Sequence, residues 1–329
     1  VFLAVNHIDN FNQRDEIYDF YSLGLGDPYP ISAVHGLGVG DLLDDLVEKL
    51  KNELSSSDKN ENLEDDSIKI ALIGRPNVGK SSIFNRLIKE NRSIVSDVQG
   101  TTRDSIDAQF STKEGQTFTI TDTAGIRRSG RVIEKTEKYS VLRAQMAVEK
   151  ADAVAVIIDA QAGIREQDKH IAGIATEKGR AVLIVVNKWD AIEKNNYTMK
   201  DFTDLIRDEF KFLDFAPILF VSAKTSQRID LIPDTAAAID ENHKKRIKSS
   251  DLNQAIIDAL AIHPTPTRNG KRLRVYYATQ VSVAPPTFVI FVNDPDLMHF
   301  SFQRYLENQI RDNFDFSGTP IVLRIRERK

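Results

Sequence analysis

The stretch "ALIGRPNVGKSS", residues 71–82, decides how this chain folds. It holds a glycine, four variable positions and then Gly-Lys-Ser. The glycines allow turn conformations closed to other residues and let backbone N–H groups approach phosphate oxygens. The lysine of such a loop meets the β- and γ-phosphates of a nucleoside triphosphate, and the serine hydroxyl binds magnesium. The stretch therefore predicts a phosphate-binding site made of Gly74, Asn77, Val78, Gly79, Lys80, Ser81 and Ser82.

Short apolar runs flank this loop and alternate with longer amphipathic stretches from Ile68 to about Asp240. The runs are "IKIALIG", "FTITDTAG", "AVAVIIDA", "AVLIVVN" and "PILFVSA". Fully apolar strands between helices indicate a parallel sheet covered on both faces. The order strand, phosphate loop, helix predicts an α/β P-loop NTPase fold, with ligands at the carboxyl ends of the strands.

Two further motifs complete the expected phosphate end of the site. In "TITDTAGI", residues 119–126, Asp122 can hold a magnesium-bound water, and the Gly125 N–H can meet the γ-phosphate, with Thr123 and Ala124 between them. In "VQGTTRDSID", residues 98–107, Thr101 or Thr102 can give magnesium a second hydroxyl when the γ-phosphate is present. That segment would be a switch, ordered by the triphosphate and loosened on hydrolysis. The expected catalytic residues are Lys80, Thr102 and Gly125.

The base is predicted to be guanine because of "NKWD" and "SAK", which follow two later strands. The Asp190 carboxylate can accept both N–H groups on one edge of guanine, a donor pair that adenine lacks. Asn187 would bond the other edge of the base or brace the loop, and the Lys188 stem would lie against the ring. Ser222 would brace Asp190, and a backbone N–H of the segment Ser222, Ala223 and Lys224 would reach the guanine carbonyl.

Composition excludes some classes of protein. The 329 residues carry a net charge of -4 and contain no cysteine, which rules out disulfides and zinc–thiolate sites. No apolar run approaches the ~18 residues that a membrane span needs. We therefore expect a cytoplasmic protein without membrane contact. The chain opens inside an apolar run without methionine, which we interpret as a fragment of a longer protein.

The charge is distributed unevenly. Residues 241–329 hold 14 Lys+Arg and 9 Asp+Glu, a net charge of +5, so the rest carries -9. This asymmetry indicates an anionic partner for the C-terminal end, although scattered surface charges would look the same. Residues 51–67, "KNELSSSDKNENLEDDS", have the composition of an acidic linker. Residues 241–329 read as a small α+β unit.

The first ten residues, "VFLAVNHIDN", repeat the pattern of "AVLIVVNKWDA" at 181–191, an apolar run that ends in Asn-x-x-Asp. Asn6 and Asp9 keep the pairing groups, whereas His7 stands where the second copy has Lys188. The later "YPISAVHGLGVGDLLDDLVEKL" parallels "PILFVSAK" and its helix. The spacing from Asn to Ser is longer in the second copy, which predicts an inserted loop or helix. Residues 1–50 therefore resemble the last third of a domain, and we expect them to bind nucleotide poorly.

Together "GRPNVGKSS", "GTTRD", "DTAGI", "NKWD" and "SAK" resemble the translation-factor-related bacterial GTPases. Longer stretches such as "EIYDFYSLGLGDPYPIS" and "PPTFVIFVNDPDLMHFSFQRYLENQIR" are similar to the Der (EngA) family, which has two tandem G domains and a C-terminal KH-like domain. The resemblance implies a partial first G domain at 1–50, a linker at 51–67, a complete second G domain at 68–240 and a KH-like domain at 241–329. It also implies GTP hydrolysis linked to assembly of the large (50S) ribosomal subunit, with GTP or GDP and Mg²⁺ bound, and we expect a monomer.

Hydrolysis is expected to be slow and potassium-stimulated. Ile126 stands where Ras-type GTPases place a water-orienting glutamine, so something else must position the water. In related members the phosphate-loop asparagine, here Asn77, helps to hold K⁺, although it could equally stabilise the loop. Two other functions stay open from the residues alone: a nucleotide-gated module for ribosome or RNA binding with negligible hydrolysis, and a P-loop kinase, against which Asp190 argues.

The C-terminal unit lacks the G-x-x-G by which ordinary KH domains clamp a nucleic-acid backbone. Its basic segments are "HKKR" at 243–246, "RNGKR" at 268–272 and "RIRERK" at 324–329. These segments are candidates for contact with rRNA phosphates. They could instead be solvated charges on a unit that only packs against the G domain.

Overall fold

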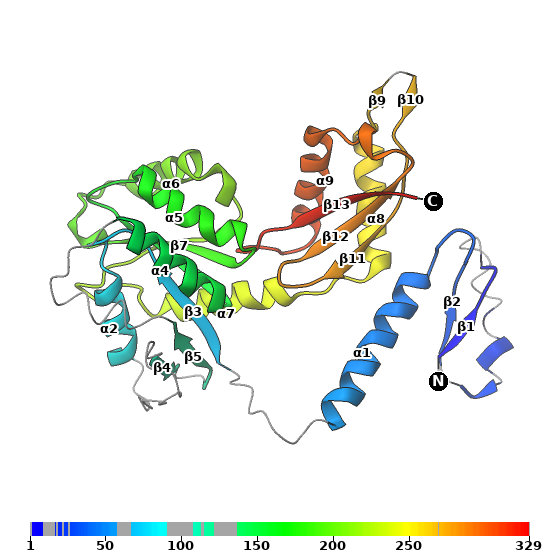
Figure 1. Cartoon of the computed structure of the whole chain (residues 1–329), viewed down its shortest axis with the longest axis horizontal. Helices are drawn as coiled ribbons and strands as arrows, with labels where there is room; N and C mark the ends of the chain where they lie inside the picture. Colours follow the sequence, from blue (N-terminus) through cyan, green and yellow to red (C-terminus); the bar gives the residue numbers. More distant parts are fainter. Residues whose placement is uncertain are drawn as a thin grey trace.

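The computed structural model (Figure 1) describes residues 2–8, 17, 19–21, 23–25, 27–57, 67–90, 108–112, 115–121, 137–268 and 270–328, with backbone only for 51–57, 90, 137–140 and 143. Three units follow one another along these residues. They are a short N-terminal unit, a central unit built on a six-stranded sheet, and a C-terminal unit built on a three-stranded sheet.

The central sheet has the mainly parallel form that the apolar runs predicted. Its strands run in the order β4-β5-β3-β6-β7-β8, and β4 alone is antiparallel to its neighbour. Edge strand β4 is the one member that the sequence did not predict. The bounds are β3 (Ile68–Ile73), β4 (Ala108–Ser111), β5 (Thr117–Ile120), β6 (Ala153–Asp159), β7 (Ala181–Asn187) and β8 (Ile218–Phe220).

Helices cover both faces of this sheet (Figure 1). One core lies under α2 (Lys80–Glu90) and α7 (Leu231–Lys244), and the other under α4 (Glu137–Lys150), α5 (Glu166–Glu177) and α6 (Thr198–Glu209). Every residue of β6 and β7 is buried, which explains why these strands lack an alternating pattern. Because β6 and β7 are buried along their whole length, they hold the loops that follow their carboxyl ends in fixed positions. Short 3-10 turns lie at Trp189–Ala191 and Lys211–Leu213.

The C-terminal unit confirms the expected α+β composition. Helices α8 (Ser249–Ile262) and α9 (Phe300–Asn313) pack with strands in the order β11-β12-β13 around one core. β11 (Val275–Ser282) and β12 (Thr287–Val292) are antiparallel, and β13 (Val322–Glu327) runs parallel to β12. A 3-10 turn at Pro295–Leu297 precedes α9. A small hairpin that the sequence did not predict, β9 (Thr267–Arg268) with β10 (Lys271–Arg272), projects from this unit (Figure 1).

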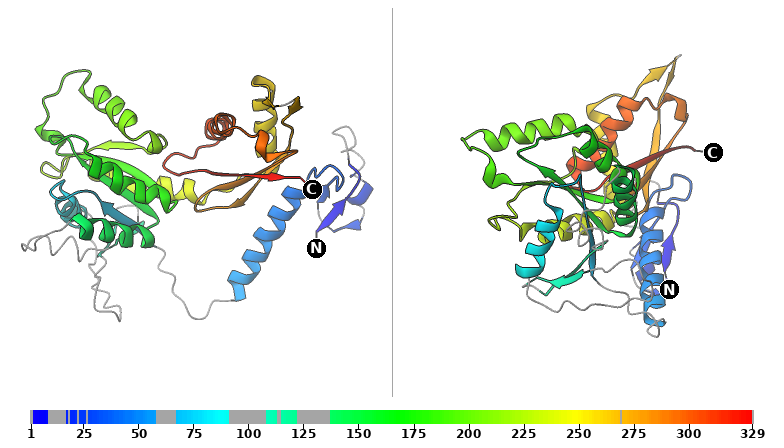
Figure 2. Two further views of the ribbon diagram at one scale, coloured as in Figure 1. Left: turned by 45° about the horizontal axis from the view of Figure 1, so that its top comes forward. Right: turned by 60° about the vertical axis from the view of Figure 1, so that its left-hand side comes forward.

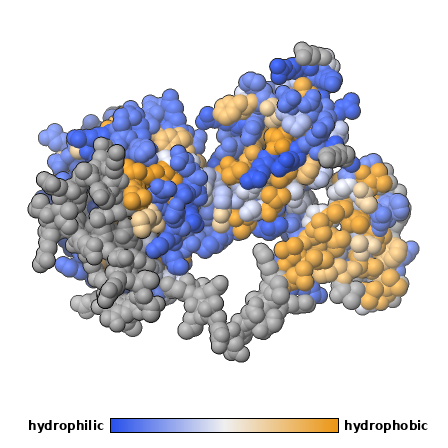
Figure 3. All heavy atoms as spheres, in the orientation of Figure 1, coloured by the Kyte–Doolittle hydropathy of each residue, from blue (hydrophilic) through white to orange (hydrophobic). Residues whose placement is uncertain are grey.

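The N-terminal unit joins β1 (Leu3–Val5) in parallel to β2 (Pro28–Pro30), followed by α1 (Val39–Ser57). Helix α1 continues into the stretch expected as a linker at 51–67, and residues 58–66 lie outside the described part. An apolar surface runs over this unit in Figure 3, where Leu43, Val47 and Leu50 are exposed. Helix α7 likewise continues past Asp240 to Lys244, across the boundary expected at 240/241.

Both outer units are fastened by specific contacts. The loop after α9 reaches the central sheet, where Val182 N donates to Gly318 O at 2.7 Å and Gly318 N donates to Phe215 O at 2.8 Å. The N-terminal unit instead touches the C-terminal unit, because Arg246 forms an ion pair with Asp44 on α1 at 3.0 Å. Figure 2 shows α1 beside the C-terminal unit and apart from the central sheet.

Candidate functional site

The predicted phosphate loop lies between β3 and the first residue of α2, with its backbone close to neighbouring strands. Gly74 has φ 148°, and a Cβ there would lie 2.6 Å from Ile157 O. Gly79 has φ 101°, and a Cβ there would collide with the Asn187 side-chain amide. Both positions therefore require glycine. The helix that starts at Lys80 directs its N-terminal N–H groups toward the loop, which favours an anion there.

The Lys80 ammonium group folds back over this loop. Its Nζ donates to Gly74 O at 2.6 Å and to Arg75 O at 2.7 Å. Two main-chain carbonyls thus hold the cation at the mouth of the loop. A phosphate group held by the loop would lie beside this ammonium, which is the arrangement that the motif predicted.

Asn187 joins the phosphate loop to the predicted guanine loops. Its Nδ2 donates to Val78 O at 2.8 Å, and its Oδ1 accepts from Ala223 N at 3.1 Å. The side chain is 2% exposed, so losing either bond would leave a buried polar atom unpaired. Of the two roles that the sequence left open for Asn187, these contacts correspond to bracing.

The Asp190 carboxylate is held by the serine that the sequence paired with it. Ser222 Oγ donates to Asp190 Oδ1 at 2.6 Å, and Thr225 N donates to Ser222 Oγ at 3.1 Å. The hydrogen bond from Ser222 lowers the pKa of Asp190 from its usual value, against a smaller opposing effect of burial. Asp190 therefore stays a carboxylate and an acceptor, the form that pairing with guanine requires.

Lys188 has a partner that the sequence did not reveal. Its Nζ lies 2.6 Å from Oδ2 of Asp159, the last residue of β6. Burial alone would raise the pKa of Asp159, but bonds from Lys188 and from the Ala162 and Gln161 amides lower it overall. The ion pair fixes the lysine stem at the edge of the site. Lys188 itself has φ 63°, a left-handed conformation.

Arg75 and Asp168 form a second contact that sequence reasoning missed. Arg75 Nε lies 3.3 Å from Asp168 Oδ1, and its Nη2 donates to Gly163 O at 3.0 Å. Asp168 also caps α5 by accepting from Arg165 N at 3.0 Å. Burial raises the pKa of Asp168, although the Arg165 amide and Arg75 oppose the shift. The pair is nearly solvent-free and ties the phosphate loop to the loop after β6.

Arg86 of α2 makes the third missed contact, with two carbonyls of the "SAK" segment. The sequence gives little sign of the contacts that Arg75, Arg86 and Asp159 make, because their partners lie far away along the chain. Other predicted residues fall outside the described part of the chain: Thr101, Thr102, Asp122, Thr123, Ala124, Gly125, Ile126 and, in the first copy, Asp9. In the part that is described, no group of three or more His, Cys, Asp or Glu side chains could hold a metal ion, and no helix is long and apolar enough to cross a membrane.

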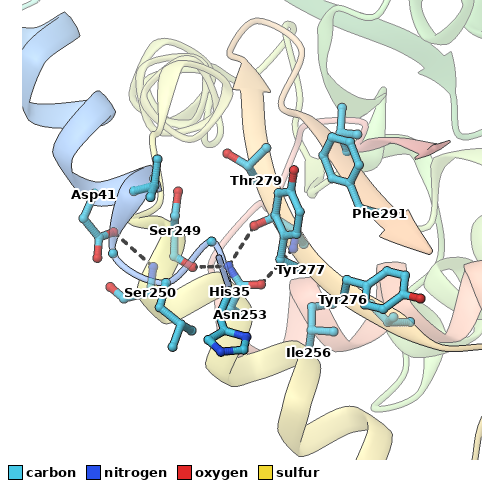
Figure 4. A pocket seen from close by; sticks show the side chains of 18 of the residues that line it. His35, Asp41, Ser249, Ser250, Asn253, Ile256, Tyr276, Tyr277, Thr279 and Phe291 are labelled. Carbon is cyan, nitrogen blue, oxygen red and sulfur yellow. Dashed lines mark hydrogen bonds between the residues drawn. The ribbon is translucent and has the colours of Figure 1, made fainter. Parts of the chain in front are cut away.

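A cavity of about 1010 Å³ lies elsewhere, between the N-terminal and C-terminal units. Figure 4 shows Asp41 next to Ser249 and Ser250 on one side of it and Tyr276 and Phe291 on the other. Ser250 N donates to Asp41 Oδ1 at 3.1 Å, so the start of α1 caps the start of α8. The cavity has no lining residue from the phosphate or guanine loops and is separate from the candidate site.

Comparisons with known proteins agree with this geometry. A family model described as "50S ribosome-binding GTPase" matches residues 69–188, and one described as "KH-domain-like of EngA bacterial GTPase enzymes, C-terminal" matches residues 246–326. GTPase Der from Leuconostoc mesenteroides subsp. mesenteroides is 61% identical over 329 residues, which are 100% of this chain and 74% of the relative. The chain belongs to the Der family of GTPases.

A second relative supports the family assignment over the same span. GTPase Der from Ligilactobacillus salivarius is 58% identical, again over 100% of this chain and 74% of the relative. A solved structure of Era in complex with MgGDPNP and nucleotides of 16S ribosomal RNA is 20% identical, with a TM-score of 0.41, over 80% of this chain and 93% of that chain. The Der assignment and the two family models confirm the G domain and the KH-like domain that the motifs predicted.

Proposed function

We propose that this Der-family GTPase binds GTP between residues 74 and 224 and uses its hydrolysis as a switch in assembly of the large ribosomal subunit. The observation that carries the proposal is the Asn187 bridge, which joins Val78 of the phosphate loop to Ala223 of the guanine segment in one buried unit. Competition of GTP against ATP for the purified protein tests the base. Equal affinity would contradict the proposal.

The residues present fit a magnesium ion beside the nucleotide. Ser81 is the second residue of α2, directly after the phosphate loop, and oxygen atoms are the ligands that Mg²⁺ prefers. We assign Ser81 and Thr102 as ligands and Asp122 as the holder of a bound water. When bound, the ion neutralises charge on the β- and γ-phosphates. Lys80 and the N–H groups of the loop, with that of Gly125, would hold the same oxygens.

Potassium stimulation is proposed through Asn77. Its φ of 67° places an asparagine in the left-handed region within the phosphate loop. An isoleucine side chain at 126 cannot hydrogen-bond a water, so a cation near the phosphates would add its positive charge to that of Lys80. Hydrolysis should be faster in K⁺ than in Na⁺, and Asn77→Ala should remove the difference. Equal rates in both salts would refute this role.

Contact with rRNA is proposed for the KH-like domain, chiefly through its β9–β10 hairpin. The "HKKR" segment is largely occupied within the chain, since His243 is buried, Lys244 pairs with Asp240 at 2.8 Å and Arg246 pairs with Asp44. By contrast Arg268, Lys271 and Arg272 are exposed on the hairpin. No acidic residue occurs between Asp258 and Asp294. An exposed, acid-free basic ribbon suits phosphate contacts.

A salt titration tests this contact. Binding to large subunits should weaken steeply with salt. The double variant Arg268→Gln, Lys271→Gln should make the negative slope of log K against log[salt] shallower by about 1.4–1.8. Lys200→Gln with Lys211→Gln, which removes the same charge from exposed sites on the G domain, is the control. The same loss of affinity in both pairs would contradict the assignment.

The runner-up function is a nucleotide-gated binding module whose hydrolysis is incidental. Multiple-turnover assays with and without large subunits separate the two. Stimulation of turnover by the subunits supports the switch, whereas nucleotide-dependent binding without turnover supports the module.

A further inference from the structure

Arg86 is placed to control guanine recognition although it lies in neither guanine motif. It stands on α2, six residues after Lys80, and reaches the segment that follows β8. Arg86 Nε donates to Ala223 O at 3.0 Å, and Arg86 Nη2 donates to Lys224 O at 3.1 Å. One planar guanidinium therefore grips two successive carbonyls.

This grip fixes the orientation of the backbone that faces the base. The peptide group is planar and trans, so fixing the Ala223 carbonyl also fixes the Lys224 N–H, which points the opposite way. Fixing the Lys224 carbonyl does the same for the Thr225 N–H, which donates to Ser222 Oγ at 3.1 Å. Ser222 Oγ in turn donates to Asp190. The contacts form a continuous path from α2 to the carboxylate that reads guanine.

The surroundings make this contact difficult to replace. Ala223 is 6% exposed, and its N–H is already donated to Asn187 Oδ1. Bonds from an ionised donor are stronger than neutral ones, and the fork of an arginine matches a pair of acceptors better than the single point charge of a lysine. Water cannot reproduce both bonds in a fixed plane.

We propose that Arg86 is a positioning residue for guanine selectivity. It connects α2, the helix after the phosphate loop, to the "SAK" loop through two hydrogen bonds. The proposal rests on the proposed function of residues 74–224 as a guanine nucleotide site. It implies that phosphate binding and base recognition are coupled through α2, because movement of the helix moves the loop that holds Asp190. In this role Arg86 acts on the nucleotide site through the Ala223 and Lys224 carbonyls.

Steady-state kinetics of Arg86→Gln with GTP and ITP test this role. Hypoxanthine lacks the exocyclic amine, so ITP cannot use both acceptor positions of Asp190. We expect the KM for GTP to rise about tenfold, the loss of roughly one charge-assisted hydrogen bond, with kcat little changed. The ratio of kcat/KM for GTP to that for ITP should fall severalfold. Arg86→Lys should recover part of both losses.

Lys89→Gln is the matched control, since it removes the same charge from an exposed position of the same helix. It should leave both constants and the ratio unchanged. Equal losses for GTP and ITP in Arg86→Gln, or values equal to those of Lys89→Gln, would overturn the proposal. A wild-type protein that does not prefer GTP to ATP would instead overturn the proposed function.

Discussion

The described residues of the two Asn-x-x-Asp copies, which leave out Asp9, fold alike but lie in different surroundings. In the first copy Ala33 N donates to Asn6 Oδ1 at 3.0 Å, as Ala223 N does to Asn187 Oδ1 at 3.1 Å in the second. A bridge between Ser32 and Leu37 matches that between Ser222 and Gln227. His7 and Lys188 both have left-handed φ, 72° and 63°. The backbone of the guanine loop is therefore specified by local sequence.

The two copies differ in the contacts that residues distant in sequence make with them. Asn187 is 2% exposed and bonds Val78 of the phosphate loop, whereas Asn6 is exposed. Lys188 has Asp159 as its ion-pair partner at the end of β6. A correct loop backbone is thus insufficient for a site. The phosphate loop and the buried strands around it make the second copy the candidate nucleotide site.

The largest expected difference between the copies is in the effect of replacing the motif asparagine by alanine. Asn187→Ala leaves Val78 O and Ala223 N without their partner, which costs about 1–3 kcal/mol for each buried group left unpaired. The KM for GTP should rise by about 100-fold. Asn6→Ala should leave the GTPase kinetics within twofold. Similar losses in both variants would erase the distinction between the copies.

Acid should weaken the contact between the unit that holds the second copy and the C-terminal unit. His243 packs against Thr319 of the C-terminal unit, with Nδ1 at 2.6 Å from Oγ1. Burial lowers its pKa to about 4, helped by Arg180 and Lys244 and opposed by Asp152. The unfolded chain takes up this proton near pH 6.5 and the folded chain does not, so stability present above pH 6.5 is lost toward pH 4.

Urea unfolding between pH 7 and pH 4.5 measures this loss, which amounts to at most about 3 kcal/mol. His243→Asn should flatten the pH dependence. His263→Gln, at an exposed histidine, should leave it unchanged. A wild-type midpoint that is independent of pH would show that His243 carries no such linkage.

Exchanging the residues that distinguish the copies should have a smaller effect. Lys188→His gives the second copy the residue of the first and removes the ion pair with Asp159. Asp159 would be left partly buried without its cation, so GTP affinity should fall by about tenfold. His7→Lys should not create a second nucleotide site. Unchanged affinity in Lys188→His would mean that the Asp159 contact is dispensable.

The smallest expected effect is that of salt on the contact between the unit that holds the first copy and the C-terminal unit. The Asp44–Arg246 pair that holds α1 is partly exposed, and such pairs contribute about 0.2–1 kcal/mol. In 1 M NaCl the distance between dyes on Glu48→Cys and Asp258→Cys should increase, and Asp44→Asn should mimic the salt. The chain has no other cysteine to interfere. A distance insensitive to both changes would assign the attachment to apolar contacts.

The sequence predicted five of the six central strands and the braced loop because both follow from local patterns. Apolar runs gave β3, β5, β6, β7 and β8, and the expected pair of Ser222 with Asp190 is present at 2.6 Å. The extra spacing in the second copy contains helix α6, as the longer interval indicated. Where a residue's partner is adjacent in the motif, spacing carries the information.

Residues whose partners are distant escaped prediction. Arg75, Arg86 and Asp159 read as ordinary surface charges in the sequence, and only the packing of α2, β6 and β8 brings them to their acceptors. Edge strand β4 was missed because its sequence, AQFS, is not an apolar run, and the β9–β10 hairpin was missed because each of its strands is two polar residues long. Residues 51–57 were expected in the linker because their composition is polar, whereas they continue helix α1.

The central claim is that residues 74–224 hold the one working nucleotide site of this chain. Titration calorimetry of GDP with Mg²⁺ tests it directly, using wild type, Lys80→Ala and Asn6→Ala. We expect one GDP bound per chain, lost in Lys80→Ala because the ammonium at the mouth of the phosphate loop is gone, and kept in Asn6→Ala. Two GDP per chain, or one that survives Lys80→Ala and disappears in Asn6→Ala, would contradict the claim.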